Sequence, residues 1–319
     1  MLMLARRTIL AATATIVLAV PATAPRADQF VNVLTGGTAG VYYPLGVALA
    51  KIYGDNIPGA RTSTQATKAS VENLNLLQAG KGEIAFTLGD SLIDGWKGTE
   101  DAGFKAPLDK LRGIAGIYNN YIQVVALQES GIKTLADLKG KRLSVGAPKS
   151  GTELNARAIL GAAGMTYDDL GKVEYLPFAE SVELMKNRQL DATLQSAGLG
   201  VASIRDLAAS VAIEVVAVPP ELVEKIGAPY QATTIPAGTY QGQDVDVAAA
   251  AVPNFLVTHS GVDDELGYQM AAQLFAHLDQ MTAAHNAAKA IKLENALAGM
   301  PVPLHPGAER FYREKGLVK

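Results

Sequence analysis

The chain has 319 residues, 28 Lys and Arg, 31 Asp and Glu, four His, no Cys and a hydrophobic fraction of 49%. Without Cys it can form no disulfide, Cys-ligated zinc site, iron–sulfur cluster or Cys nucleophile. A formal net charge of −3 argues against a general nucleic-acid-binding protein. The length leaves room for two domains with a sizeable core, and the scattered His residues predict neither a metal site nor a cofactor.

Residues 1–27 have the pattern of a secretory signal peptide. Two arginines precede an apolar run over residues 9–20, which is short for a membrane span and ends at Pro21. Cleavage after Ala27 is favoured over cleavage after Ala24, where a proline would follow. The paired arginines leave twin-arginine export open beside ordinary secretion. Removal of this segment changes the formal net charge from −3 to −6.

Strands alternate with helices in the first half of the mature chain. An apolar run at residues 30–34 precedes a glycine-rich turn and a helical pattern over residues 41–52. Ser70 is a favourable N-cap for the next predicted helix. The further elements are strands at 60–65 and 84–88, a helix at 70–78, and strand-like segments at 111–117 and 122–127.

A second unit repeats this alternation, which predicts parallel sheets with crossover helices in two lobes. The expected strands are 142–146, 173–176, 190–194, 214–218 and a long β-rich run at 245–257. The expected helices are 153–163, 181–187, 201–208, 263–281, 282–298 and 307–315.

Two loops, Thr35–Gly40 and Lys149–Thr152, each follow a strand and precede a helix. Ligands of open α/β folds bind at such strand ends, where helix N-termini offer free N–H groups and a positive dipole end. Hydroxyl side chains in both loops add hydrogen-bond donors. Together the loops predict a site for a small anion, typically a carboxylate, although simple turns and N-caps would give the same pattern. Neither loop has the GxxxxGK[ST] or GxGxxG pattern.

The tetrapeptide Gly89-Asp90-Ser91-Leu92 spells the nucleophile block of the GDSL esterases. A Ser nucleophile needs a His base, which that family presents in an Asp-x-x-His pattern that this sequence lacks. A secreted esterase using Ser91 is therefore only an alternative. We expect no enzyme, with Asp90 and Ser91 as polar groups on a strand-end loop that faces the cleft.

The segment Leu34–Gly46, which reads LTGGTAGVYYPLG, closely resembles the opening signature of TAXI-family solute-binding proteins of TRAP transporters. The resemblance continues in order along the mature chain, through the blocks 70–74, 135–141, 145–153, 190–193 and 235–240. Two departures are visible. Ala39–Gly40 replaces a typical Gly-Gly, and Lys68–Ala69 replaces a Gly-Gly pair before Ser70, so that Lys68 either adds a positive charge at the cleft or points to solvent.

This resemblance implies an α/β fold of the type II periplasmic binding protein class, with two lobes of parallel-type sheets joined by two crossover strands. It implies a periplasmic, monomeric protein that captures a small organic anion or amino acid by hinge closure, a carboxylate such as glutamate or 2-oxoglutarate. The implied partner is a TRAP membrane subunit with fused small and large membrane domains, and no nucleic acid. An ABC-type importer or a sensor-linked receptor are alternative partners for the same fold.

The lobes are expected to comprise residues 28–119 with 254–319, and residues 120–253, with hinges near 117–123 and 250–255. The candidate ligand-binding residues come from both loops and from neighbouring strand ends and helix starts. They are Thr35, Gly37, Thr38, Tyr42, Ser70, Asn73, Asp90, Ser91, Lys149, Ser150, Gly151, Thr152, Gln195 and Ser196.

Overall fold

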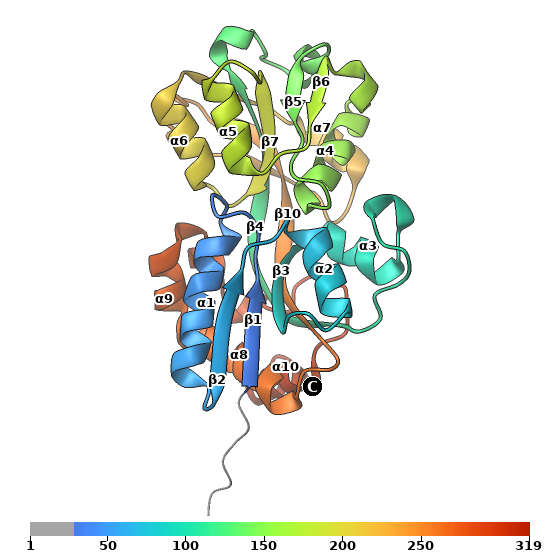
Figure 1. Ribbon diagram of the computed structural model, residues 1–319, viewed down its shortest axis with the longest axis vertical. Helices are drawn as coiled ribbons and strands as arrows, with labels where there is room; N and C mark the ends of the chain where they lie inside the picture. The colour runs from blue at the N-terminus through green and yellow to red at the C-terminus, as the bar shows by residue number, and fades with distance from the viewer. Residues whose placement is uncertain (1–28) are drawn as a thin grey trace, which may run out of the picture.

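In the computed structural model, which describes residues 29–319, one mixed ten-stranded sheet runs through two lobes (Figure 1). The predicted signal peptide lies outside the described residues. The strand order is β2-β1-β3-β10-β4-β7-β5-β6, while β8 pairs with β4 and β9 pairs with β10. Within residues 29–319, none of the helices combines the length and hydropathy that a membrane span requires.

The first lobe, at the bottom of Figure 1, is built on the parallel strands β2, β1 and β3. All five residues of β3 are buried, as expected of a central strand with the sequence IAFTL, whereas β2 alternates between half-buried and exposed residues at the sheet edge. The elements of this lobe are β1 (Gln29–Leu34), α1 (Tyr42–Asn56), β2 (Ala60–Gln65), α2 (Ser70–Gln78), β3 (Ile84–Leu88), α3 (Gly89–Lys97), α8 (Asp264–Ala276), α9 (Leu278–Ala284) and α10 (Pro306–Glu314).

The second lobe repeats a parallel arrangement in β7, β5 and β6, to which β8 and β9 are added through antiparallel pairs with the connecting strands. Its elements are β5 (Arg142–Ser144), α4 (Gly151–Ala162), β6 (Lys172–Glu174), α5 (Phe178–Lys186), β7 (Ala192–Ala197), α6 (Ala202–Ser210), β8 (Ile213–Val216), α7 (Pro220–Ile226) and β9 (Gln231–Ile235). The expected parallel sheets are therefore right for the core of each lobe, but they form one continuous sheet with antiparallel pairs at its centre.

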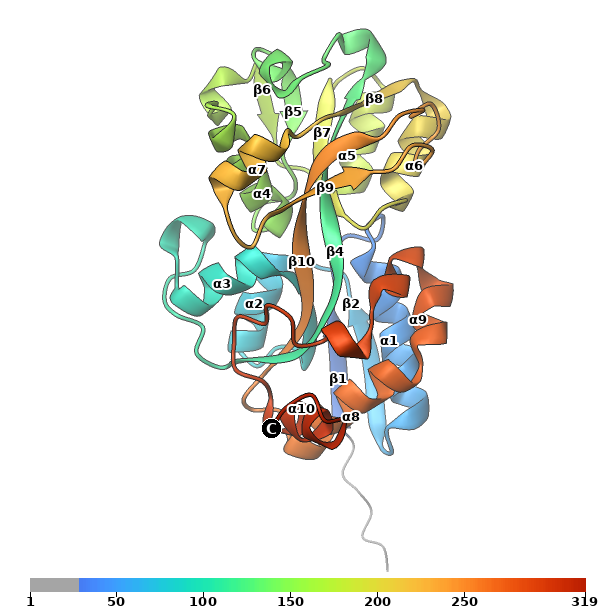
Figure 2. The same cartoon turned by 180° about the vertical axis from the view of Figure 1, so that it is seen from behind.

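Two long antiparallel strands, β4 (Leu111–Leu127) and β10 (Val247–His259), pass through both lobes, as the view from behind shows (Figure 2). β10 pairs with β9 over residues 247–251 and with β3 over residues 254–257. This change of partner falls inside the hinge segment predicted at 250–255. The lobe boundaries at 119/120 and 253/254 lie within these shared strands and stay a prediction.

Three sequence-based expectations about these elements were wrong. The expected helix 263–281 is divided at His277 into α8 and α9. The strand-like segments 111–117 and 122–127 form the single strand β4. The expected helix 282–298 is replaced by the end of α9 and two 3-10 turns, Asn286–Ala290 and Leu293–Asn295. Tertiary contacts override helix propensity here. The Gly116 amide donates to the Ala296 carbonyl at 2.6 Å, which ties this segment to β4.

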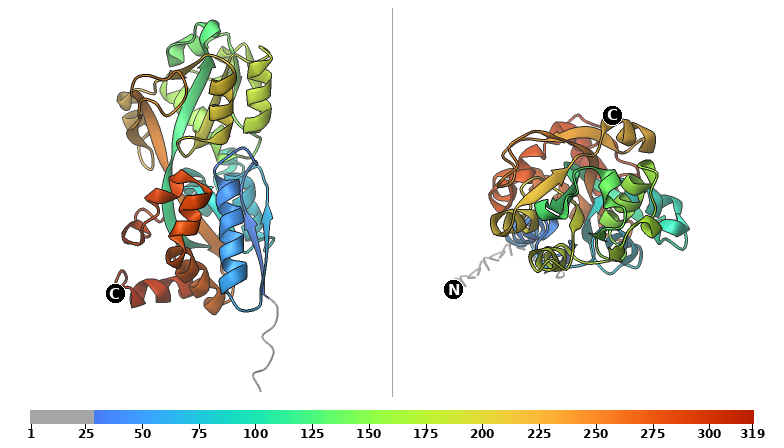
Figure 3. Two further views of the ribbon diagram at one scale, coloured as in Figure 1. Left: turned by 90° about the vertical axis from the view of Figure 1, so that its left-hand side faces the viewer. Right: turned by 90° about the horizontal axis from the view of Figure 1, so that it is seen from above.

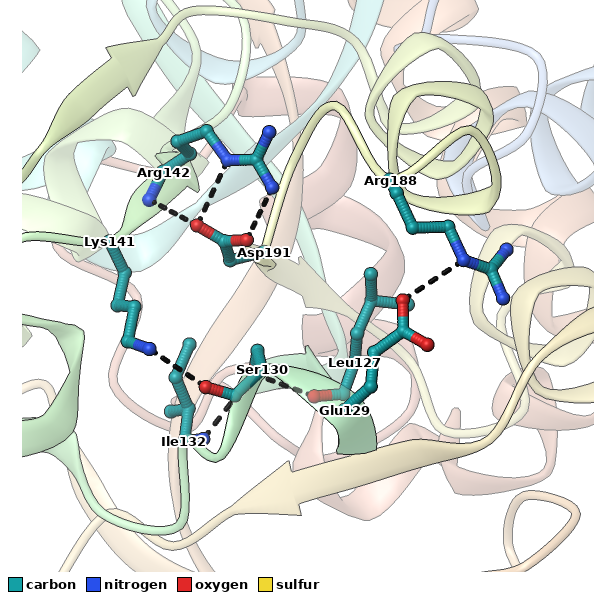
Figure 4. Close-up of polar contacts among 8 residues, drawn as sticks. All are labelled: Leu127, Glu129, Ser130, Ile132, Lys141, Arg142, Arg188 and Asp191. Carbon is teal, nitrogen blue, oxygen red and sulfur yellow. Dashed lines mark hydrogen bonds and ion pairs between the residues drawn. The ribbon is translucent and has the colours of Figure 1, made fainter.

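Polar contacts join the starts of β5 and β7 in the second lobe (Figure 4), which lies above the first lobe in the side view of Figure 3. The Asp191 carboxylate accepts from the Arg142 backbone amide at 2.8 Å and from its guanidinium at 3.0 and 2.6 Å. These charge-assisted bonds lower the pKa of Asp191 and join the strand β5 to the turn that precedes β7. The second lobe is thus held in register at its far end.

Candidate ligand-binding site

A cavity of about 110 Å³ lies between the lobes, at the carboxyl ends of their parallel strands. We call it the interlobe cavity. Its lining combines backbone and small residues with hydroxyl, amide and aromatic side chains. The lining residues are Gly36, Gly37, Gly40, Val41, Tyr42, Thr67, Lys68, Ala69, Ser70, Leu88, Asn120, Ala147, Ser150, Gly151, Thr152, Pro177, Phe178, Ser196 and Ala197.

Four helices begin at this cavity: α1 at Tyr42, α2 at Ser70, α4 at Gly151 and α5 at Phe178. The first-turn amides of a helix have no intrahelical acceptor, and each helix start carries a partial positive charge. α1 and α2 have no side-chain cap that would satisfy these amides. The cavity therefore has a positive electrostatic character built from backbone, to which the exposed Lys68 adds the one formal charge in its lining.

Ala69 shows that the start of α2 is held in an unusual conformation. Its φ of 70° and ψ of −145° lie in a region that favours glycine. The Thr67 hydroxyl accepts from the Ala69 amide at 2.9 Å, which helps to fix this turn. The strain fits the substitution noted above, where Ala69 stands in place of a family glycine.

The floor of the cavity is formed by hydrogen-bonded side chains on the two connecting strands. The Asn254 amide donates to Asn120 Oδ1 at 2.8 Å, and Asn120 Nδ2 donates to the Ser196 carbonyl at 2.8 Å. The Tyr42 hydroxyl donates to Asn254 Oδ1, and its ring stacks on Phe86 at a centroid distance of 5.2 Å. Burial raises the pKa of Tyr42, so that this hydroxyl stays protonated.

The lobes contact each other around the cavity, so the structure is a closed conformation. The Glu72 amide of α2 donates to the Lys149 carbonyl at 3.2 Å, and the Arg157 guanidinium donates to the Asp101 carbonyl at 2.8 Å. The lobes approach each other most closely at Gly151. A Cβ atom there would lie 2.6 Å from Leu88 and 2.8 Å from each of two first-lobe hydroxyls.

A buried carboxylate forms a second contact between the lobes. Asp90, which is 8% exposed, accepts from the Tyr230 hydroxyl at 2.7 Å and from the Asn155 amide. Asn155 in turn accepts from the Ser196 hydroxyl at the cavity wall. Burial raises the pKa of Asp90 to about 6, although hydrogen bonds from Tyr230 and the Ser91 amide oppose the shift. We call Asp90, Asn155, Tyr230 and Ser196 the interlobe network.

The structure brings half of the sequence-predicted site residues to the cavity. Gly37, Tyr42, Ser70, Ser150, Gly151, Thr152 and Ser196 line it. Thr35, Thr38, Asn73, Asp90, Ser91, Lys149 and Gln195 do not. The role of all fourteen residues in binding stays a prediction.

Several of the residues outside the lining are engaged in structural hydrogen bonds. The Thr35 hydroxyl donates to the Gln65 carbonyl at 2.7 Å, and Asn73 donates to the Thr35 and Phe86 carbonyls. Gln195 accepts from the Ser203 hydroxyl at 2.6 Å. Thr38 and Lys149 are exposed. The expectation that Asp90 and Ser91 lie on a strand-end loop was wrong, because α3 begins directly after β3, at Gly89.

Sequence reasoning missed the aromatic and strand contributions to the site. Pro177 is the N-cap of α5 and Phe178 its first residue, and Asn120 comes from the middle of β4. The strand–turn–helix order around Pro177 was available as a signal. For Asn120 the only signal was a polar residue inside an apolar strand run.

A wider hollow of about 890 Å³ involves the same two connecting strands and the C-terminal 3-10 segments. It is lined by Asn119, the neighbour of Asn120, and successive strand residues face opposite sides of a sheet. Lys289 is the one charged residue in its lining. No three His, Cys, Asp or Glu side chains of residues 29–319 gather closely enough to hold a metal ion.

Comparisons with known proteins bear on this fold. A model described as the NMT1-like family matches residues 33–316. The chain is similar to the alkanesulfonate-binding protein SsuA from Xanthomonas axonopodis pv. citri bound to MOPS, with a TM-score of 0.52 and 13% identity over 92% of this chain and 96% of that chain.

Two further solved structures are similar. One is an ABC uptake transporter substrate binding protein from Streptococcus pneumoniae with bound histidine, with a TM-score of 0.52 and 14% identity over 82% of this chain and 95% of that chain. The other is a putative L-cystine ABC transporter from Listeria monocytogenes, with a TM-score of 0.51 and 17% identity over 83% of this chain and 98% of that chain. These similarities confirm the predicted α/β fold of the type II periplasmic binding protein class.

Gly151→Ala is expected to shift the molecule from the closed to an open conformation. The added methyl group meets Leu88 and two hydroxyls of the other lobe, and overpacking of this kind costs about 1–3 kcal/mol, or roughly a 5- to 150-fold change in the ratio of closed to open. Small-angle scattering should show a larger radius of gyration. Gly161→Ala is the control, because nothing lies within 4 Å of that position on the same helix. Equal radii of gyration for Gly151→Ala and Gly161→Ala would contradict the interlobe contact at Gly151.

Asp90→Asn is expected to change how stability depends on pH. The pKa of Asp90 is raised in the folded state, so its stabilising effect is complete at low pH and is lost as pH rises through about 6. Relative to the parent, the variant should gain about 2 kcal/mol in free energy of unfolding between pH 4 and pH 8. Denaturant titrations across this range measure the difference. A constant difference would show that Asp90 ionises normally.

Proposed function

The chain belongs to the NMT1-like family, and we propose that it is a periplasmic solute-binding protein that closes its lobes around a small organic anion and delivers it to a membrane transporter. Three observations support this: the fold, the closed contacts between the lobes, and a cavity at their boundary. The signal-peptide pattern of residues 1–27 supports export.

The convergence of four helix starts on one cavity is the observation that carries the proposal. Two hydroxyls at these helix starts, those of Ser70 and Ser150, each accept from a backbone amide, and the Ser70 hydroxyl also hydrogen-bonds the Tyr42 side chain. Ser70 accepts from the Leu88 amide at 3.1 Å, and Ser150 accepts from the Glu153 amide at 3.2 Å. Amides, hydroxyl donors and the Lys68 ammonium together suit an anion such as a carboxylate or a sulfonate.

We propose that binding involves no chemical change of the ligand. An esterase would need a His base within reach of Ser91. Ser91 is fully buried, and its hydroxyl lies 3.4 Å from Asp90. The four His rings make hydrogen bonds to backbone groups of residues 82, 261, 262, 273, 287 and 307, none of them adjacent to Ser91 in the chain.

We propose an ABC-type importer as the membrane partner. Two of the similar structures carry names that include an ABC transporter, which supports this type of coupling. A TRAP transporter is the second candidate, favoured by the resemblance of Leu34–Gly46 to the TAXI signature. The two differ in energy source, because an ABC importer uses ATP and a TRAP transporter uses an ion gradient.

Lys68→Gln is expected to weaken anion binding three- to tenfold, the effect of one solvent-accessible charge worth about 0.7–1.4 kcal/mol. Isothermal titration with a panel of small monocarboxylates and sulfonates measures the dissociation constants. Lys289→Gln, in the wider hollow, is the matched control and should leave them unchanged. A larger loss of affinity in Lys289→Gln than in Lys68→Gln would place the anion in the wider hollow.

Uptake experiments separate the two partners. Right-side-out vesicles that contain the membrane partner are loaded with ATP or with a non-hydrolysable analogue and supplied with this protein and the tightest-binding anion of the panel. Uptake is expected with ATP even after an ionophore has collapsed the ion gradients. Uptake that survives without ATP and stops with the ionophore would contradict ABC coupling and favour the TRAP transporter.

A further inference from the structure

The interlobe cavity has no acidic side chain in its lining, in the part of the chain that the structure describes. Its one charged lining residue is Lys68, a cation. The buried carboxylate of Asp90 belongs to the interlobe network behind the wall. Its two oxygens already accept from the Ser91 amide, the Tyr230 hydroxyl and the Asn155 amide. No carboxylate is therefore available to pair with a positive group of a ligand.

We infer that the ligand is a small anion without an ammonium group, a hydroxy or oxo carboxylate or a short sulfonate, and that free amino acids are poor ligands. This inference rests on the proposed function, because it names the ligand class of the same cavity. It narrows the expectation drawn from the sequence, which allowed glutamate beside 2-oxoglutarate.

The electrostatics of the closed cavity exclude an ammonium group. Four helix N-termini and Lys68 all repel a cation. Closure removes the water that would otherwise solvate the cation, and a buried charge without a partner is strongly unfavourable. The hydroxyls in the lining can accept a hydrogen bond, but they supply no opposite charge. For an α-amino acid, the unfavourable free energy of burying the ammonium group therefore offsets the favourable free energy of binding the carboxylate.

The apolar part of the lining indicates which group the ligand carries in place of an ammonium group. Val41, Tyr42 and Leu88 of the first lobe, with Pro177 and Phe178 of the second, supply apolar surface to the cavity. Its volume of about 110 Å³ is well below the roughly 300–1,000 Å³ of a drug-sized pocket, so the carbon skeleton must be short. A short aliphatic tail attached to an anionic head fits this combination of size and chemistry.

Matched sets of acids with one skeleton test the inference directly. One set is 3-methyl-2-oxobutanoate, 2-hydroxy-3-methylbutanoate and L-valine. The other is 2-oxoglutarate, 2-hydroxyglutarate and L-glutamate. Isothermal titration should give a dissociation constant at least 100-fold higher for the amino acid than for the best acid of its set. An amino acid that binds as tightly as its oxo analogue overturns the inference and leaves the proposed function standing. No binding by any of these acids or by short sulfonates overturns both.

A charge-reversing variant provides a second arm. Lys68→Glu replaces the one cation of the lining by a carboxylate and should raise the affinity ratio of amino acid to oxo acid at least tenfold. Lys289→Glu is the matched control, since this exposed residue lines the wider hollow instead. Equal ratios for parent and both folded variants, with folding checked by thermal melting, would overturn the inference.

Discussion

The antiparallel pair of β4 and β10 is the constraint on which the rest of the structure depends. Both strands cross from one lobe to the other, and each lobe adds its parallel strands to them from opposite ends. The carboxyl ends of both parallel sets therefore face the same boundary, and the helices that follow them start there. The positive character of the cavity is thus a consequence of strand direction, and it needs few charged side chains.

The same arrangement explains which parts could be predicted from the sequence. The turn after β1 and the turn before α4 have local signals, namely glycine, hydroxyl residues and the change from strand to helix periodicity. The starts of α2 and α10 were predicted within one residue for the same reason. The C-terminal segment after α9 lacked such signals. Its turns depend on contacts with β4, which lies more than 150 residues earlier in the chain.

Which residues line the cavity depends on contacts between lobes, and these are invisible in local patterns. Asn73 has the right residue type and a helix-start position, but its amide is used by the Thr35 and Phe86 carbonyls. Phe178, in contrast, has no local pattern that marks it as a cavity residue. Closure brings it against Gly40 of the opposite lobe, 3.8 Å from where a Cβ atom there would lie.

The interlobe network links closure to the chemistry of the cavity. Asp90 accepts from the Asn155 amide nitrogen, which turns Asn155 Oδ1 toward Ser196. The Ser196 hydroxyl donates its only proton there, so toward the cavity it presents acceptor lone pairs alone. The Ser150 oxygen accepts from the Glu153 amide, so that its hydroxyl can turn its proton toward the cavity. A ligand with an anionic head and one neutral hydroxyl satisfies both kinds of group, and only in the closed state, because Asp90 and Ser196 belong to different lobes.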